Sequence, residues 1–196
     1  MRSFHQIYRR WGLKVLLLCL AVLCVLAAIG LVGSFNAAFR NQDAFASLID
    51  EAALRHGVQP ELIRAVIKRE SRFFPWRVGD AGEIGLMQIT EGAVRDWERV
   101  TGNQCSYRGM LFDPRLNIEI GTWYLARSLQ RWDGDPMADA LALAEYNAGY
   151  GNVRDWVRQG EVDDTLRWVR FRGTREYIRA VCKYRDEFMR GRVTRE

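Results

Sequence analysis

Residues 70–89 read ESRFFPWRVGDAGEIGLMQI, and they begin with a glutamate at the end of a predicted helix. Ile63, Val66, Ile67 and Glu70 follow one another at i, i+3, i+4 and i+7, which is one face of an α-helix. Glu70 therefore leaves the helix on the same side as three aliphatic side chains. A carboxyl group held against apolar groups has a raised pKa and stays protonated near neutral pH, as a general acid requires. This pattern makes Glu70 a candidate catalytic acid, the alternative being a solvated charge at a helix end.

The chain around this stretch predicts helix after helix, with almost no alternation of period two. Gly57 and Gly149 are suited to helix ends, and Asp113-Pro114 and Asp135-Pro136 to helix starts. The expected helices span about 45–56, 60–71, 90–100, 114–132, 136–149, 152–159 and 174–190. The sequence therefore predicts one all-α domain.

The N-terminal region contains an uncharged apolar run. Residues Val15 to Val32 lack charged side chains and follow four basic residues, Arg2, Arg9, Arg10 and Lys14. Such a helix approaches the ~30 Å thickness of the hydrocarbon layer, which predicts a membrane span, with a cleaved signal peptide as the alternative. Because the basic residues precede the span, the N-terminus is expected in the cytoplasm and the following domain in the periplasm, so that the protein is a single-pass protein of the inner (cytoplasmic) membrane.

The expected organisation follows from these features. It comprises a cytoplasmic basic n-region (1–14), a transmembrane anchor or signal sequence (15–33), a juncture (34–44), a helical domain (45–190) and a C-terminal tail (191–196).

The charge distribution disfavours nucleic-acid binding. The net charge is +5, but residues 1–40 hold five basic side chains and no acidic ones, so residues 41–196 are neutral overall. Within the neutral part, the last 32 residues are basic. They form either a solvated helix face or a contact with an anionic surface such as lipid head groups.

Histidines and cysteines are scarce. With only His5 and His56, neither a zinc site nor a catalytic triad with a histidine base can be assembled, so no metal or cofactor is expected. Two of the four cysteines lie in the apolar run. The other two, Cys105 and Cys182, either form a disulfide or stay as free thiols.

Polar and aromatic residues gather in two motifs that accompany Glu70. The loop VGDAGEIGLMQIT is rich in glycine, which lets backbone approach a ligand, and ends with Met87 and Gln88. The motif AEYNAGYGNV places Tyr146 and Asn147 at the end of an alanine-rich helix. These groups around a protonated carboxyl are typical of a carbohydrate site, although Met87 could fill the core and Tyr146 could hydrogen-bond a helix end.

Five blocks carry a family resemblance: ES-RFFPW, GEIGLMQIT, DPRLNIEIGTWYLARSL, ALAEYNAGYGNVRDW and RGTREYIRAV. In this order and spacing, from about Phe45 to Phe188, they resemble the catalytic domain of the soluble-type lytic transglycosylases. The resemblance implies an all-α, goose-lysozyme-like fold in the domain 45–190. It also implies peptidoglycan glycan strands as the substrate, no cofactor, and partners in the cell envelope that the sequence does not identify.

The resemblance assigns roles to residues of this chain. It implies that Glu70 is the sole catalytic acid and base. The substrate-binding residues that it implies are Ser71 beside the glutamate, Met87 and Gln88 along the saccharide cleft, and Tyr146 and Asn147 over the scissile region.

Two positions depart from the family pattern. Gly79 stands where the family commonly has a serine that contacts the substrate N-acetyl group. Glu83 stands where an alanine is frequent, so this second carboxylate is either structural or tunes Glu70.

A single carboxyl group suffices when the substrate supplies the nucleophile. The implied reaction cleaves the β-1,4 bond between N-acetylmuramic acid and N-acetylglucosamine and closes a 1,6-anhydro ring without consuming water. A lysozyme-like hydrolase is one alternative, with Asp80, Glu83 or Glu145 as a second carboxylate. An inactive peptidoglycan-binding scaffold is another, for which Gly79 is the only hint.

Overall fold

The computed structural model describes residues 14, 18, 20–30, 42–105, 108–160 and 162–193, without the side chains of residues 192 and 193. The chain divides into two compact units, Met1–Phe39 and Arg40–Glu196. In the first unit residues 20–30 are helical. The rest of the predicted span 15–33, apart from Leu18, lies outside the described residues, as do the juncture up to residue 41 and residues 194–196 of the tail. Across the described residues, no helix combines the length and apolar character needed to cross a membrane.

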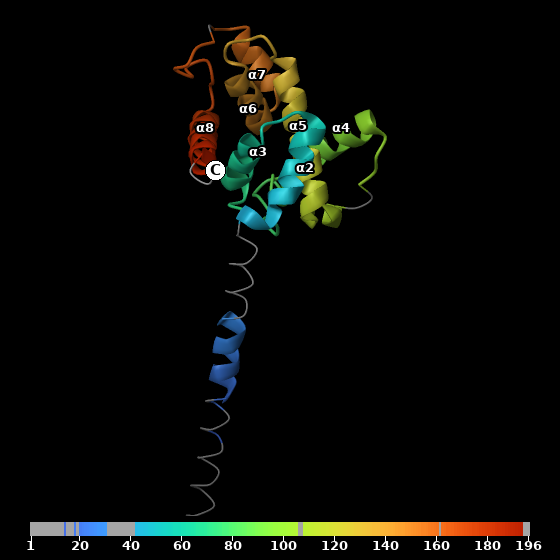
Figure 1. Ribbon diagram of the computed structural model, residues 1–196, viewed down its shortest axis with the longest axis vertical. Coiled ribbons are helices and arrows are strands. Elements are labelled where there is room, and N and C mark those ends of the chain that lie inside the picture. Colours follow the sequence, from blue (N-terminus) through green and yellow to red (C-terminus); the bar gives the residue numbers. More distant parts are fainter. Residues whose placement is uncertain are drawn as a thin grey trace, which may run out of the picture. The chain divides into compact units, whose positions relative to one another are not determined.

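The second unit is built from helices (Figure 1). In order, they are η1 (Gln42–Phe45), α2 (Ala46–His56), α3 (Pro60–Glu70), α4 (Glu91–Thr101), η2 (Arg108–Phe112), α5 (Pro114–Arg131), α6 (Ala138–Ala148), α7 (Tyr150–Val157) and α8 (Arg172–Val193). Pairing of β type in the described residues is limited to two isolated bridges, Val78 with Ile84 and Ile84 with Ile89. The predicted all-α fold is confirmed.

Most helix ends lie where the sequence predicts them. Gly57 ends α2 in the left-handed conformation, and the Asp113 side chain caps the first turn of α5. The prediction at Asp135-Pro136 is wrong, because α6 begins at Ala138. The Asp135 carboxylate accepts a hydrogen bond from the Met137 amide at 2.7 Å, so it caps a turn that precedes the helix.

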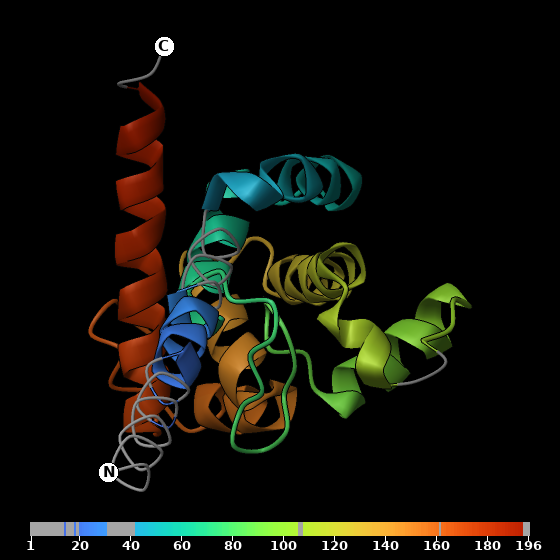
Figure 2. The same cartoon turned by 90° about the horizontal axis from the view of Figure 1, so that it is seen from below.

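The packing brings the two halves of the unit together. Helix α3 lies along α8, α5 packs against α2 and α6, and α6 also packs against α7 and α8 (Figures 1 and 2). The predicted face of α3 is fully buried at Ile63, Val66 and Ile67. Each such side chain contributes roughly 1.5–3 kcal/mol through burial. This packing fixes the end of α3, and with it Glu70, against the C-terminal helix.

The two cysteines of the second unit are free thiols. Cys105 and Cys182 are both half-buried and unbridged. Burial raises the pKa of each thiol, which leaves both poorly nucleophilic at neutral pH.

The buried side chain of Asn117 ties the loop after α3 to α5. Its Nδ2 donates to the backbone oxygens of Ile84 and Leu111, each at 2.8 Å, and its Oδ1 accepts from the Met87 amide at 2.8 Å. Gly85 lies between these contacts with φ +84, and a β-carbon there would lie 2.7 Å from the Leu111 oxygen. The sharp turn of the loop therefore depends on a glycine at 85 and an amide at 117.

We predict that Asn117→Ala lowers the free energy of unfolding by about 3 kcal/mol, because buried backbone groups lose their partners. Urea denaturation checks this prediction. Asn152→Ala is the matched control, since the exposed Asn152 amide reaches only the Ala148 oxygen. Equal unfolding midpoints for the two variants would contradict the role given to Asn117.

Candidate active site

Glu70 is the last residue of α3, at a point where the chain turns sharply. The amide and hydroxyl of the buried Ser71 both donate to the Ile67 oxygen, at 2.9 and 3.2 Å. The next two residues, Arg72 and Phe73, have φ values of 54° and 62°. Both values lie in the left-handed region of backbone conformation, where non-glycine residues are strained. Such strain is found often at functional sites. The buried Ser71 thus caps the C-terminal end of α3, and the turn that follows it positions Glu70.

The environment of Glu70 favours its protonated form. Its side chain keeps partial access to solvent, yet burial is the largest effect on its carboxyl and raises the pKa from 4.5 to about 7. The Tyr177 hydroxyl and the charges of Arg69 and Arg77 lower the pKa, while the charge of Glu83 raises it. Near neutral pH Glu70 therefore holds a proton that it can donate and take back.

Tyr177 of α8 brings a hydroxyl to this carboxyl group. The hydroxyl is close enough to lower the pKa of Glu70, but it is buried and has no hydrogen bond of normal geometry in the described part of the chain. Burial raises the pKa of Tyr177 well above its usual value, so the hydroxyl remains a donor. The sequence predicts a helix over 174–190 that includes Tyr177, but it assigns no role in the site to this residue. The available signal was a hydroxyl within an apolar face.

Gln88 supports the loop from inside. Its Nε2 donates to the backbone oxygens of Arg77 (3.2 Å) and Gly85 (3.0 Å), and its Oε1 accepts from Nε of Arg77 at 3.3 Å. Its φ of 50° is in the left-handed region. The amide thus holds the loop closed while the side chain stays half-exposed.

Met87 lies behind the loop. Its side chain is fully buried, and its sulfur is 3.9 Å from the Thr122 hydroxyl. Its backbone oxygen accepts a hydrogen bond from the Tyr146 hydroxyl at 2.9 Å. In this structure Met87 therefore fills the core, as the alternative interpretation expects, and a contact with saccharide stays a prediction.

Tyr146 and Asn147 stand at the end of α6. Burial, followed by the charge of Glu70, raises the pKa of Tyr146 well above its usual value, so this phenol lies within electrostatic reach of the candidate acid. Asn147 is exposed and accepts a hydrogen bond from the buried Thr174 of α8 at 2.8 Å. The structure thus brings Tyr146 toward Glu70, while Asn147 links α6 to α8.

Glu83 occupies the space above Gly79. A β-carbon at position 79 would lie 3.2 Å from Cδ of Glu83, closer still to its Oε2, and 2.8 Å from Oε1 of Gln88. Glu83 Oε2 accepts a hydrogen bond from the Ala81 amide at 3.2 Å. The two departures from the family pattern are therefore one feature, because this carboxylate position requires a residue without a side chain at 79.

The other candidate carboxylates are placed differently. Glu145 is buried, accepts a hydrogen bond from the Trp132 indole at 2.9 Å and pairs with Arg131 at 3.3 Å, which makes it part of the packing. Asp80 is exposed on the loop. Of the three acids considered as a second catalytic carboxylate, Glu83 is the one whose charge acts on Glu70.

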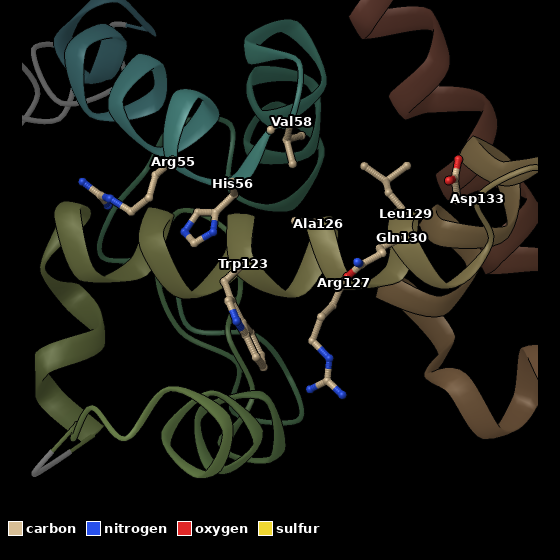
Figure 3. Close-up of a pocket in the computed structure, with 10 residues that line it drawn as sticks. Arg55, His56, Val58, Trp123, Ala126, Arg127, Leu129, Gln130 and Asp133 are labelled. Atoms are coloured by element: carbon tan, nitrogen blue, oxygen red, sulfur yellow. The ribbon is translucent and has the colours of Figure 1, made fainter.

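A pocket of about 530 Å³ lies between the end of α2 and α5, and none of the predicted site residues lines it (Figure 3). His56 is paired with Glu119 at 2.8 Å, and the Arg127 guanidinium lies 5.1 Å from the centre of the Trp123 ring. No group of histidine, cysteine and acidic side chains in the described residues could hold a metal ion. The pocket offers no acid in an apolar setting, so the site at Glu70 remains the candidate for catalysis.

The chain is similar to one protein family and to several proteins described as transglycosylases. A family model described as Transglycosylase SLT domain matches residues 47–168. The chain is 43% identical over 114 residues to the membrane-bound lytic murein transglycosylase F of Desulfosudis oleivorans, covering 57% of this chain and 23% of that protein. It is 36% identical over 116 residues to the membrane-bound lytic murein transglycosylase C of Sodalis glossinidius, covering 56% and 32%.

Solved structures show the same similarity. The 70 kDa soluble lytic transglycosylase of Escherichia coli superimposes with a TM-score of 0.65 at 29% identity, covering 71% of this chain and 23% of that chain. A complex of the 70 kDa soluble lytic transglycosylase with bulgecin A gives a TM-score of 0.68 at 29% identity, covering 74% and 24%. The chain therefore spans about a quarter to a third of the length of these relatives.

We predict that Glu70→Gln stabilises the protein at alkaline pH. Because folding raises the pKa of Glu70 from 4.5 to about 7, the folded state binds the proton more tightly, and the stability that this contributes is lost as the pH rises through that interval. The variant should exceed the wild type by about 3 kcal/mol above pH 8 and match it below pH 4.5. Urea denaturation across pH measures the difference, and a constant difference would contradict the assignment.

Proposed function

Because the chain belongs to the Transglycosylase SLT domain family, we propose that it is a peptidoglycan lytic transglycosylase with Glu70 as its catalytic acid and base. Family membership confirms the resemblance inferred from the sequence blocks. The observation that carries the proposal is a carboxyl group whose pKa is raised by burial to about 7, at the end of a helix in this family's fold. Such a group can act as acid and base at the pH of the periplasm.

The proposed reaction cleaves the β-1,4 bond between N-acetylmuramic acid and N-acetylglucosamine. Glu70 donates its proton to the glycosidic oxygen, which leaves with the electron pair of the broken bond. The acetamido oxygen of the muramic acid bonds to the anomeric carbon and forms an oxazolinium ring. The C6 hydroxyl then attacks that carbon, the ring reopens to the amide, and the hydroxyl proton returns to Glu70. The product is a 1,6-anhydro sugar, and no water enters.

The neighbouring residues are proposed to bind the glycan strand. Tyr146 and Asn147 at the end of α6 would lie over the scissile region, and Gln88 would face the saccharide from the loop. The buried Ser71 and Met87 would act indirectly, by shaping the turn after α3 and the loop. We propose that Glu83 tunes Glu70, since its charge raises the pKa of that carboxyl.

Hydrolysis is a second candidate function. The observation that favours it is a second carboxylate, Glu83, whose charge acts on Glu70, because many glycosidases use two carboxyl groups. No observation favours an inactive peptidoglycan-binding scaffold. The Glu83 carboxylate occupies the space next to Gly79, where the family commonly has a serine side chain.

We predict that Glu70→Gln lowers the rate of glycan cleavage at least ~10²-fold, as the loss of a general acid does. The measurement is mass spectrometry of the fragments released from purified peptidoglycan by the full-length protein. Wild-type fragments should end in 1,6-anhydro-N-acetylmuramic acid, lighter by one water than hydrolysed ends.

Glu91→Gln provides the matched control, because Glu91 is an exposed residue of α4 and should leave the rate unchanged. Reducing ends from the wild type would establish a hydrolase. Binding to peptidoglycan with no fragments would establish the scaffold, and near-full activity of the Glu70→Gln variant would refute the assignment of the acid.

We propose that residues 15–33 anchor the protein in the inner membrane, with residues 1–14 in the cytoplasm and the catalytic domain in the periplasm. The described apolar side chains of this segment are exposed, among them Leu20, Leu23 and Ile29 at 49%, 61% and 62%. A helix that is apolar on all sides needs an apolar surrounding. Cell-envelope partners other than peptidoglycan and the membrane are not assigned.

We predict that the full-length protein stays with membranes after extraction with alkaline carbonate, because an apolar helix is held by the lipid rather than by charge. A chain that begins at Ser34 behind a cleavable export signal should be released. Intact mass spectrometry of the membrane-bound protein distinguishes an anchor from a signal peptide, since cleavage near residue 33 would contradict the anchor.

A further inference from the structure

The carboxylate of Glu83 is held in place by the loop but is not neutralised. Its Oε2 accepts from the Ala81 amide, and its Oε1 has no hydrogen-bond partner in the described part of the chain. No lysine, arginine or histidine of that part forms an ion pair with it. It is half-exposed, and its charge acts on Glu70. The carboxylate therefore has one oxygen without a partner in the described residues, and this acceptor is available to a ligand.

The proposed reaction creates a positive charge next to that acid. When the acetamido oxygen bonds to the anomeric carbon and the glycosidic bond breaks, the positive charge spreads over the oxazolinium ring, whose nitrogen still carries its proton. That N–H becomes a much stronger donor than it is in the ground-state amide. A carboxylate that accepts this hydrogen bond stabilises the transition state more than the substrate, which is the condition for catalysis.

We infer that Glu83 is a second catalytic residue, whose carboxylate accepts a hydrogen bond from the acetamido N–H of the substrate and stabilises the oxazolinium ion. The inference rests on the proposed function and deepens it. Glu83 neither attacks a carbon nor transfers a proton, so the proton of Glu70 and the electrons of the glycosidic bond follow the path already given.

The loop prepares Glu83 for this role before the substrate arrives. Gly79 leaves room for the carboxylate, and the backbone closes a turn here, with the Gly79 amide donating to the backbone carbonyl oxygen of Glu83 at 2.8 Å. The hydrogen bond from Ala81 holds one carboxylate oxygen and leaves the other free. A charge positioned in advance needs no rearrangement during the reaction, which is why fixed groups stabilise transition states well.

Glu83→Gln tests the inference through the pH dependence of the rate. If Glu83 only tunes Glu70, the variant lowers the pKa of Glu70, and full activity returns at a lower pH. If Glu83 binds the acetamido group, kcat stays about 10²-fold below wild type at every pH, comparable to the loss of one preorganised group at a transition state. Full recovery at a lower pH would overturn the inference.

Gly79→Ala is a companion variant that keeps the charge and moves the carboxylate. The φ of Gly79 is not in the left-handed region, so alanine fits the backbone, and its β-carbon displaces the ends of the Glu83 and Gln88 side chains. We expect Gly79→Ala to lose activity to a similar extent as Glu83→Gln, with an unchanged unfolding midpoint in urea. Wild-type activity in a folded Gly79→Ala variant would overturn the inference.

A binding measurement reports on the same contact without turnover. The bicyclic thiazoline made from N-acetylmuramic acid imitates the oxazolinium ring, and calorimetry with the full-length protein measures its affinity. We expect Glu83→Gln to weaken binding of the thiazoline at least tenfold and binding of a peptidoglycan tetrasaccharide much less. Equal weakening of both ligands, or of neither, would overturn the inference.

The outcomes separate this inference from the proposed function. Wild-type protein that releases no anhydro ends overturns both. Wild-type protein that releases them, with a Glu83→Gln variant that is equally active at its own optimum, overturns only the role of Glu83.

Discussion

The side chain of Asn117 holds the backbone groups on which the candidate site depends. By binding Ile84, Met87 and Leu111 together, it sets the path of the loop that follows α3. The Met87 oxygen then receives the Tyr146 hydroxyl, and the same loop carries Gln88 and Glu83. One buried amide thus links α5, the loop and the end of α6. The chemistry proposed for Glu70 requires this scaffold because the loop by itself contains no regular secondary structure.

Much of the fold could be predicted from the sequence because its signals are local. The face of α3 that ends in Glu70 follows from the spacing of three aliphatic residues. Glycines mark the ends of α2 and α6, and an aspartate-proline pair marks the start of α5. The predicted start of α6 was wrong because an aspartate can cap a turn as well as a helix, and the two uses look alike in sequence. The sequence allowed Met87 either to fill the core or to contact a saccharide, and only the structure shows that its side chain is buried.

The parts of the site that could not be predicted depend on contacts between distant residues. In the sequence, Gly79 and Glu83 are two separate departures from a family pattern. In the structure, the Glu83 carboxylate occupies the space that a side chain at position 79 would need. The sequence assigned no role to Tyr177, because only the packing of α8 on α3 brings its hydroxyl to Glu70. The family match itself ends at residue 168, before α8 begins. Spacing along the chain carries no information about either contact.

The pairing of α3 with α8 joins segments that are made far apart in time. Glu70 is synthesised well before Arg172–Val193, which supplies the helix packed against α3. Until that helix docks, Glu70 lies on a solvated chain and is an ordinary glutamate, ionised at neutral pH. The acid therefore gains its proton only when the last helix is in place. A chain that has lost its C-terminal helix therefore keeps Glu70 but lacks part of the burial that raises the pKa of its carboxyl group.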